Sequence, residues 1–244
     1  MKGVMSPPDF GILYDLGGCL GVDKPPGVLT QAPPGIDSLE LRIKAFLRHR
    51  AATASDGGTP AEIYLGIPHR LDRPVSGAMI FGLDWKTTRR LAAQFEKRRV
   101  RKTYWACTTG KVEPPAGTWC DFVRKIPGLP RAEVVPPGHP EGRQAILHYR
   151  TLALTPWGSW LEIELETGRM HQIRVQAAAR GLPVLGDEDY GATVPFGPQH
   201  EDRRLRAIAL HSRTLSFKHP LTHQEVTLVA PLPEAWAHAG LVAP

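Results

Sequence analysis

The segment Gly66-Ile-Pro-His69-Arg70-Leu71-Asp72-Arg73-Pro74-Val75-Ser76-Gly77 places a carboxylate in a polar loop between two apolar stretches. Arginines stand on both sides of Asp72 in this loop. Neighbouring guanidinium groups favour the ionised form of a carboxylate, which is the form that acts as a nucleophile. An Asp–Arg pair that only braces the loop explains the segment equally well when it is taken alone.

Alternating or short apolar runs bounded by turn residues predict the strands around this loop. They cover Gly11–Leu16, Cys19–Asp23, Ile63–Ile67, Val75–Leu83, Val100–Thr109, Ile146–Leu154, Trp160–Leu165, Leu205–Leu210, Thr214–Phe217 and Glu225–Val229. Gly17-Gly18 predicts a hairpin between the first two strands. Residues 51–60 and 192–202 are expected to be loops, and residues 114–143, rich in Pro and Gly, are expected at the surface with short strands at most.

Three helices are predicted from apolar spacing and capping residues. The first runs from Asp37 or Ser38 to about residue 50, with Glu40 completing an Asp-x-x-Glu capping box. Asp84 caps the second, whose apolar face comprises Trp85, Thr88, Leu91, Ala92 and Phe95. The third covers Arg169–Arg180 and ends at Gly181. Strands joined mostly by turns indicate an α+β fold built on a largely antiparallel sheet with a few flanking helices and loops.

The chain of 244 residues is long enough to bury a full core, and we expect one domain over residues 1–244 with its core at about 12–232. It carries 30 Lys and Arg against 24 Asp and Glu, a formal net charge of +6. Two basic clusters stand out, at residues 86–102 and at Arg203, Arg204 and Arg206. They are typical of a nucleic-acid partner, although a run of charge is also common on a solvated helix face.

The three cysteines, Cys19, Cys107 and Cys120, are scattered and lack a Cys-x-x-Cys spacing. We therefore expect no disulfide framework, no metal site and a reducing compartment. No stretch has the length of a membrane span and the first residues lack an apolar signal core, so a cytoplasmic protein without a membrane partner is expected. A monomer without cofactor is the simplest expectation.

The loop motif His69-Arg70-Leu71-Asp72-Arg73-x-x-Ser76-Gly77 is similar to the signature of the RluA family of pseudouridine synthases. Further segments resemble motifs of that family in the same order along the chain. These are Val22-Asp-Lys-Pro-Pro-Gly27, Arg101-Lys-Thr-Tyr-Trp-Ala106, Thr167-Gly-Arg-Met-His-Gln-Ile-Arg174, Gly186-Asp187-x-x-Tyr190-Gly191 and Leu210-His211-Ser212. The resemblance extends over nearly the whole chain.

The resemblance implies RNA as the partner, a catalytic cleft and a role for each matching residue. Asp72 is implied as the nucleophile, Tyr104 as the residue that stacks on the uracil near C5, and Arg174 as the partner of Asp72. Arg70 is implied to fill the gap left by an extruded nucleotide. The implied substrate-binding or architectural set also contains His69, Arg169, His171, Gln172 and Leu210.

The chain departs from the family pattern at Asp23, Val75 and Gln176, which affects the expected choice of substrate and not the reaction type. Many relatives carry an N-terminal S4 RNA-binding domain, and only about ten residues precede the first motif here, so that domain is expected to be absent.

The implied reaction is the isomerisation of uridine to pseudouridine within ribosomal or transfer RNA. Attack of the aspartate on C1′ and elimination to a glycal remain alternative routes. A catalytically inactive RNA-binding protein of the same fold and a uracil glycosylase are alternative functions. The first would lack Asp72, Tyr104 or Arg174, all of which are present, and the second would need a paired carboxylate beside Asp72.

Overall fold

The computed structural model describes residues 9–54 and 62–241 and contains one sheet of ten strands. The strand order is β1-β2-β3-β9-β4-β8-β7-β5-β6, and β10 pairs with β9 outside this path. Among the described strand pairs, β3 with β9 is the only parallel one. With four helices against this sheet, the predicted α+β class and the largely antiparallel sheet are confirmed. No helix in these two ranges is long and apolar enough to cross a bilayer.

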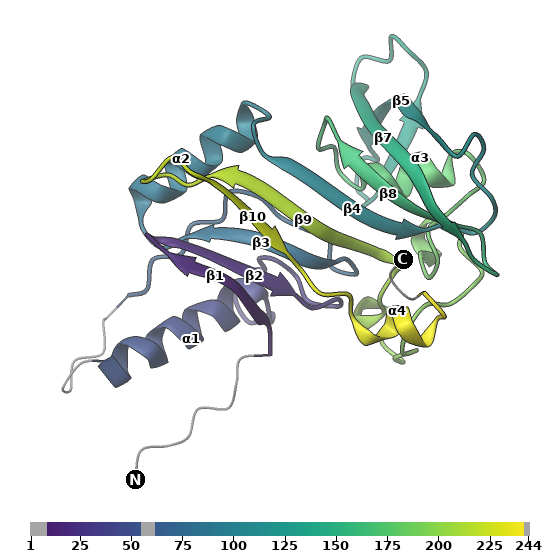
Figure 1. The fold of residues 1–244 in the computed structure, drawn as a ribbon. Helices are drawn as coiled ribbons and strands as arrows, with labels where there is room; N and C mark the ends of the chain where they lie inside the picture. The colour runs from purple at the N-terminus through teal and green to yellow at the C-terminus, as the bar shows by residue number, and fades with distance from the viewer. Residues whose placement is uncertain (1–8, 55–61, 242–244) are drawn as a thin grey trace.

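The N-terminal part of the sheet holds three strands between two helices (Figure 1). The strands are β1 (Gly11–Leu16), β2 (Cys19–Lys24) and β3 (Ser76–Gly82), and the helices are α1 (Leu39–Ala54) and α2 (Trp85–Glu96). Met79 and Phe81 of β3 pack in the same cluster as Leu39 and Ile43 of α1. Alternate residues of β3 pack instead with Leu91 of α2. Because both of its faces are covered, β3 is buried over its whole length.

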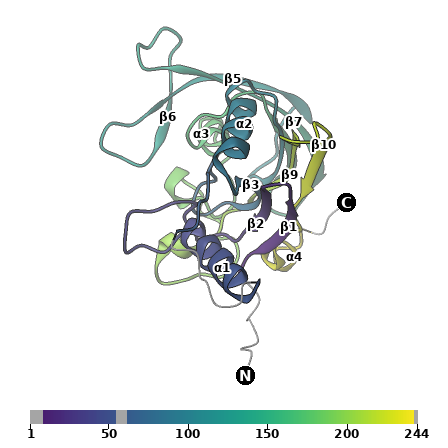
Figure 2. The ribbon, with the colours of Figure 1, turned by 90° about the vertical axis from the view of Figure 1, so that its left-hand side faces the viewer.

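The remaining strands form the centre and the far half of the sheet. They are β4 (Arg101–Cys107), β5 (Ala116–Lys125), β6 (Ala132–Val135), β7 (Arg143–Leu154), β8 (Ser159–Leu165), β9 (Leu210–Lys218) and β10 (Glu225–Val229). Helices α3 (Gln172–Ala178) and α4 (Glu234–His238) and two short 3₁₀ turns, Glu188–Tyr190 and Arg203–Leu205, complete the fold. The hairpin that carries β6 projects away from the rest of the molecule (Figure 2).

The hairpin at Gly17-Gly18 is confirmed, since both glycines have the positive φ, 59° and 77°, that a tight hairpin turn requires. The Asp84 cap is confirmed as well, because its carboxylate accepts the Thr87 N–H at 2.8 Å. The face predicted for α2 is wrong at Trp85, which is 62% exposed. The Arg89 guanidinium lies over the Trp85 ring at 4.8 Å and shields part of it.

Helix α1 is longer than predicted, and of its two predicted capping residues Ser38 is the one that caps it. It runs to Ala54, so only residues 55–60 of the expected loop are left, and these lie outside the described residues. Ser38 caps it by accepting the Leu41 N–H at 3.3 Å. The predicted capping box is wrong, because Asp37 pairs with Arg42 and the Glu40 carboxylate pairs with Lys44 one turn later.

Several predicted boundaries are wrong for reasons of tertiary packing. Residues 63–67 contribute only an isolated bridge between Gly66 and Gly82. The segment expected to hold short strands at most contains the ten-residue strand β5. The strand predicted at Leu205–Leu210 is wrong, because residues 205–209 are not in a strand, and the strand predicted at Thr214–Phe217 is part of the longer strand β9, which begins at Leu210. Helix α3 is shorter than expected and starts at Gln172, after a residue in the left-handed conformation.

Candidate active site

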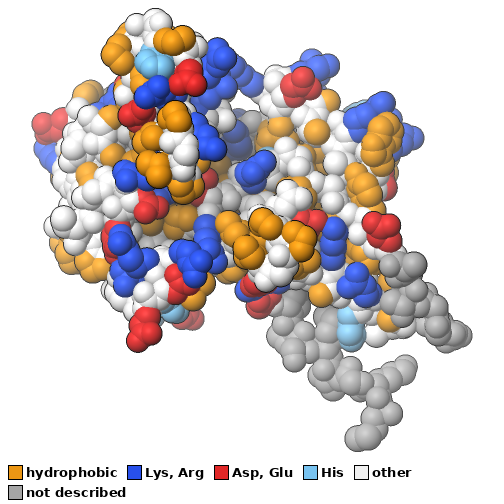
Figure 3. Space-filling view, turned by 180° about the vertical axis from the view of Figure 1, so that it is seen from behind, with side chains coloured by type: hydrophobic (Ala, Val, Ile, Leu, Met, Phe, Trp, Pro, Cys, Tyr) orange, Lys and Arg blue, Asp and Glu red, His pale blue; other side chains and the backbone are white. Residues whose placement is uncertain are grey.

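A cleft of about 1500 Å³ contains the residues that the sequence motifs singled out. It is lined by the loop before β3, by β4, by the start of α3 and by the turns around residues 187 and 204. The face seen in Figure 3 is hollowed, and Lys and Arg side chains surround the hollow. The fold therefore brings motifs from distant parts of the chain to one concave site.

The loop that carries Asp72 is fixed by bonds to backbone groups on either side of it. The Thr30 hydroxyl donates to the Leu71 carbonyl at 2.9 Å and accepts the Leu71 N–H at 3.2 Å. The Arg73 Nε donates to the Gly27 carbonyl at 2.9 Å. The buried Lys24 ammonium donates to the Arg73 carbonyl at 3.2 Å, and burial lowers the pKa of Lys24 to about 7. Asp72 thus has a defined position before any substrate binds.

The guanidinium that faces Asp72 belongs to Arg174 of α3. Its Nη1 lies 3.5 Å from Asp72 Oδ2, while its Nε and Nη2 each donate to Asp187 at 2.7 Å. Burial acts to lower the pKa of Arg174, but the hydrogen bonds and charge of Asp187 and the charge of Asp72 raise it above its ordinary value. Arg174 is therefore a permanent cation locked by Asp187, with one nitrogen left for Asp72.

Tyr104 of β4 lies in the cleft wall and is 8% exposed. Its strand is held between β8 and β9, where it pairs with Ile163 and Ser212. Burial, together with the charge of Asp72, raises the pKa of Tyr104 above its ordinary value. The phenol therefore keeps its proton at neutral pH, so it can act on another proton only as a relay or after giving up its own.

His69 and Gln172, which the motifs place in the substrate-binding set, make internal bonds. The His69 Nε2 accepts the Ile80 N–H at 3.0 Å, its ring stacks on Phe95, and burial lowers its pKa to about 3. The Gln172 Oε1 accepts from the Thr167 hydroxyl and from the Arg169 N–H. Both residues line the cleft while bracing its walls, and their contact with substrate stays a prediction.

The other predicted substrate-binding residues also line the cleft. Arg70 is exposed on the loop two positions before Asp72. The Arg169 Nε donates to the Gln144 carbonyl at 2.9 Å, and Leu210 is buried at the start of β9. His171 stands between Asp72 and Tyr190, with its Nε2 3.8 Å from Asp72 Oδ1 and its Nδ1 2.9 Å from the Tyr190 hydroxyl.

Basic side chains from both predicted clusters reach this cleft. Those that line it are Arg98, Arg99, Arg101 and Lys102 before and within β4, and Arg203, Arg204 and Arg206 on the opposite segment. Acidic neighbours pair with the second group, since Glu188 binds both Arg203 and Arg206. Lys86, Arg89, Arg90 and Lys97 of the first cluster do not line the cleft.

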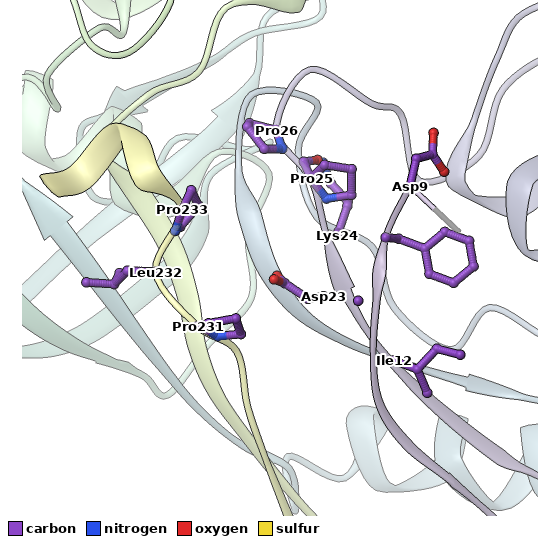
Figure 4. Close-up of a pocket in the computed structure, with 11 residues that line it drawn as sticks. Asp9, Ile12, Asp23, Lys24, Pro25, Pro26, Pro231, Leu232 and Pro233 are labelled. Carbon is purple, nitrogen blue, oxygen red and sulfur yellow. The ribbon is translucent and has the colours of Figure 1, made fainter. Parts of the chain in front are cut away.

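The three departures from the family pattern lie in different surroundings. Val75 is buried in the cleft wall. The Gln176 amide donates to Asp121 at 2.6 Å and lies outside the cleft lining. Asp23 lines a second pocket of about 630 Å³ among Pro25, Pro26 and Pro231–Pro233, where burial raises its pKa to about 6 (Figure 4).

The sequence assigned no role to Asp187 and Tyr190, which the structure places against Arg174. Both belong to the motif Gly186-Asp187-x-x-Tyr190-Gly191, so the motif itself was the available signal. Asp187 is 1% exposed, and Tyr190 is buried under the Arg174 guanidinium, which lies 4.9 Å from its ring centre. Their position behind Arg174 depends on how the 3₁₀ turn folds back on α3, which spacing alone does not reveal.

The sequence and the fold are similar to those of known proteins. A family model described as RNA pseudouridylate synthase matches residues 19–179. An RNA pseudouridine synthase of Synechocystis, itself named uncharacterised, is 33% identical over 91% of this chain and 65% of its own length. The ribosomal large subunit pseudouridine synthase D of Xanthomonas campestris is 31% identical over 92% of this chain and 66% of its own. The structure titled human RNA pseudouridylate synthase domain containing 4 is 25% identical, with a TM-score of 0.71 over 94% of this chain and 91% of that one.

The cleft, its ordered motifs and these matches define the class, and the chain belongs to the RluA-type RNA pseudouridine synthase family. The resemblance found in the sequence is thereby confirmed. The chain spans about 65% of the length of these curated relatives.

Proposed function

We propose that this protein isomerises uridine to pseudouridine within an RNA chain, with Asp72 as the nucleophile. The observation that carries the proposal is the placement of Asp72 in a basic cleft, 3.5 Å from a buried Arg174 that Asp187 holds from behind. A fixed cation beside a carboxylate keeps the carboxylate oriented without protonating it. The buried phenol of Tyr104 supplies an aromatic face in the same cleft.

The reaction breaks the N1–C1′ bond of uridine and forms a C5–C1′ bond, so the product has the same atoms as the substrate. Asp72 either attacks C1′ directly or assists elimination to a glycal, and the detached uracil then turns within the pocket. The proton on C5 leaves after the new bond forms, and the nitrogen released from the sugar gains one. Tyr104, protonated at rest, can pass a proton near C5 as a relay.

The charge of the cleft fits a polyanion. Cationic side chains on two sides of the site, from the Arg98–Lys102 segment and the Arg203–Arg206 segment, can contact phosphates on either side of a target nucleotide. A base must leave its stack before C1′ and C5 can be reached, and Arg70 on the loop is placed to fill the vacated space. Ribosomal RNA is the first substrate to test, because one relative is named as a large-subunit pseudouridine synthase.

A uracil glycosylase would need a second carboxylate free to work with Asp72. Asp187 and Asp189 both pair with the same arginine, which occupies both oxygens of Asp187 and lies 3.4 Å from Asp189. We therefore favour isomerisation, and release of free uracil distinguishes the two activities.

The test compares wild type with Asp72→Asn on ribosomal and transfer RNA from cells that lack this gene. Nucleoside mass spectrometry measures pseudouridine and free uracil, while filter binding measures RNA affinity. We expect wild type to form pseudouridine without uracil release. Asp72→Asn is expected to bind RNA with nearly unchanged affinity and to form no product, since an amide cannot serve as the nucleophile. A variant with more than about a tenth of wild-type activity would exclude Asp72 as nucleophile, because that loss is only about 1.4 kcal/mol of barrier.

A further inference from the structure

His171 adopts a backbone conformation that its residue type seldom takes. Its φ is 51° and its ψ is 28°, in the left-handed region, directly before α3. Such a conformation costs free energy for a residue with a Cβ and persists only where the surroundings impose it. Here it turns the imidazole into the cleft, where the ring has Asp72 on one side and Tyr190 on the other.

The hydrogen bonds around Tyr190 determine where the proton of His171 lies. The Tyr190 hydroxyl accepts the Ala132 N–H at 2.9 Å, and burial raises the pKa of Tyr190, so the phenol keeps its own proton. The His171 Nδ1 lies 2.9 Å from the phenol oxygen, within reach of that proton. Burial also lowers the pKa of His171, more strongly than the charge of Asp72 raises it, so the ring is neutral. A neutral imidazole that accepts at Nδ1 carries its hydrogen on Nε2.

The His171 Nε2 lies 3.8 Å from Asp72 Oδ1, so Asp72 is the carboxylate that a hydrogen on Nε2 can approach. The opposite tautomer would turn a lone pair toward the carboxylate and would be repelled by it. A separation of 3.8 Å is longer than a hydrogen bond, and contacts of this kind commonly tighten when substrate fills a site. Arg174 reaches the other oxygen, Oδ2, at 3.5 Å, so the two carboxylate oxygens face two different donors.

We propose that His171 is a positioning residue for Asp72, and that Tyr190 fixes it as an Nε2–H donor from an anchor on β6. The proposal deepens the proposed function and rests on it. Arg174 and His171 together set the rotation of the Asp72 carboxylate, which decides the oxygen that faces C1′. The anchor is the Ala132 N–H at the start of β6, so this chain of contacts links the projecting hairpin to the nucleophile.

Two guanidinium groups pack on the ring of Tyr190, the residue that joins this chain of contacts to the hairpin. The Arg131 guanidinium, next to Ala132, lies 5.3 Å from the Tyr190 ring centre, and the Arg174 guanidinium lies 4.9 Å from it. Removing only the Tyr190 hydroxyl leaves both of these ring contacts in place. Tyr190→Phe therefore cuts the links to His171 and to the Ala132 N–H while the ring stays in place.

The first experiment measures kcat and KM for Tyr190→Phe, with Tyr149→Phe as the matched control. The Tyr149 hydroxyl donates to the Pro114 carbonyl at 3.2 Å, and Tyr149 is buried outside the cleft lining. We expect kcat of Tyr190→Phe to fall between about tenfold and a hundredfold with KM within about twofold, because a misplaced reacting group loses rate and not affinity. The control is expected to keep wild-type kcat. A kcat of Tyr190→Phe within twofold of wild type would overturn the proposal.

The second experiment compares His171→Gln with His171→Met. Both side chains have similar length and meet the same left-handed backbone, but only Gln carries an N–H near the position of Nε2. We expect Gln to retain several-fold more kcat than Met at equal thermal stability. Equal activity of the two variants would mean that His171 fills space without donating.

The third experiment reads the tautomer directly by NMR of protein labelled with ¹⁵N-histidine. The His171 signal, assigned by its loss in His171→Gln, is expected to show a bare Nδ1 and a protonated Nε2. A protonated Nδ1 would overturn the proposal even in the absence of any activity data. If wild type forms no pseudouridine on any RNA tested, the proposed function fails, whereas this NMR result still decides the tautomer.

Discussion

Arg174 donates two hydrogen bonds of 2.7 Å to Asp187, whereas it lies 3.5 Å from Asp72. The closer carboxylate is therefore the one buried behind the arginine and not the one exposed to the cleft. A guanidinium locked in this way needs no rearrangement when substrate arrives, and the field it exerts on Asp72 is set in advance.

The first prediction concerns the strength of this lock. Asp187→Asn removes one charge from a pair in which both side chains are at most 2% exposed, and it leaves the guanidinium with only the more distant carboxylates of Asp72, at 3.5 Å, and Asp189, at 3.4 Å. Breaking a buried pair from one side costs about 3–5 kcal/mol. We expect a loss of that size in the free energy of unfolding, measured by urea titration. The control is Asp121→Asn, whose partner Arg180 is 29% exposed, and equal losses in the two variants would contradict the prediction.

The second prediction separates stacking from proton transfer at Tyr104. Tyr104→Phe keeps the aromatic face and removes the phenol that burial keeps protonated. We expect the variant to bind RNA and to form the intermediate that depends on Asp72, but not to complete the product. Denaturing gels detect a covalent adduct and mass spectrometry detects pseudouridine. Product formation at the wild-type rate would restrict Tyr104 to stacking.

The third prediction tests the basic cleft as a phosphate-binding surface. Neutralising Arg98, Arg99 and Arg101 is expected to weaken binding to target and non-target RNA alike, and to flatten the slope of log affinity against log salt by about 2 to 3 units. The control neutralises Lys86, Arg89 and Lys97, which carry the same charge on the same segment but do not line the cleft. An unchanged slope in the first variant, or equal changes in both, would mean that these arginines lie on a solvated face.

The fourth prediction concerns stability in acid. Burial lowers the pKa of His69 to about 3, so between about pH 6.5 and pH 3 the unfolded chain binds a proton that the folded protein does not. The folded state therefore loses stability as the pH falls through that range. His69→Gln keeps an acceptor for the Ile80 N–H but does not titrate. We expect the difference in unfolding free energy between pH 7 and pH 4.5 to be smaller in the variant than in wild type, and an equal difference would contradict the assignment.

Local signals in the sequence predicted a large part of this molecule. Strands β1 and β10 have the predicted bounds, and the Asp84 cap begins α2 as expected, because turn glycines and capping carboxylates act over a few residues. Strand β5 was not predicted at its full length, because only Trp119 and Val123 are buried along it. Two buried residues four positions apart do not produce the alternation by which a strand is recognised.

The sequence predicted which residues form the site, but it did not predict which of them form ion pairs with one another. The motifs named Asp72, Tyr104 and Arg174, and the structure brings all three to one cleft. The distances from Arg174 to Asp187 and to Asp72 differ by less than 1 Å. The turn at residues 187–190 determines which of the two carboxylates is bound more tightly. The late start of α3, at Gln172 after the left-handed His171, likewise follows from tertiary contacts and not from helix propensity.

The parallel pairing of β3 with β9 has a consequence for the chain as it leaves the ribosome. Ser76 and His211, which face each other in this pair, are 135 residues apart. Since synthesis adds roughly 5–20 residues per second, the edge of β3 stays unpaired for on the order of ten seconds before β9 is made. Strand β4 has the same missing partner, because β9 lies between the two. Unpaired edges invite association with other chains, so β3 and β4 are open to such association until β9 has been synthesised. Asp72 thus reaches its final surroundings only after β9 has been synthesised.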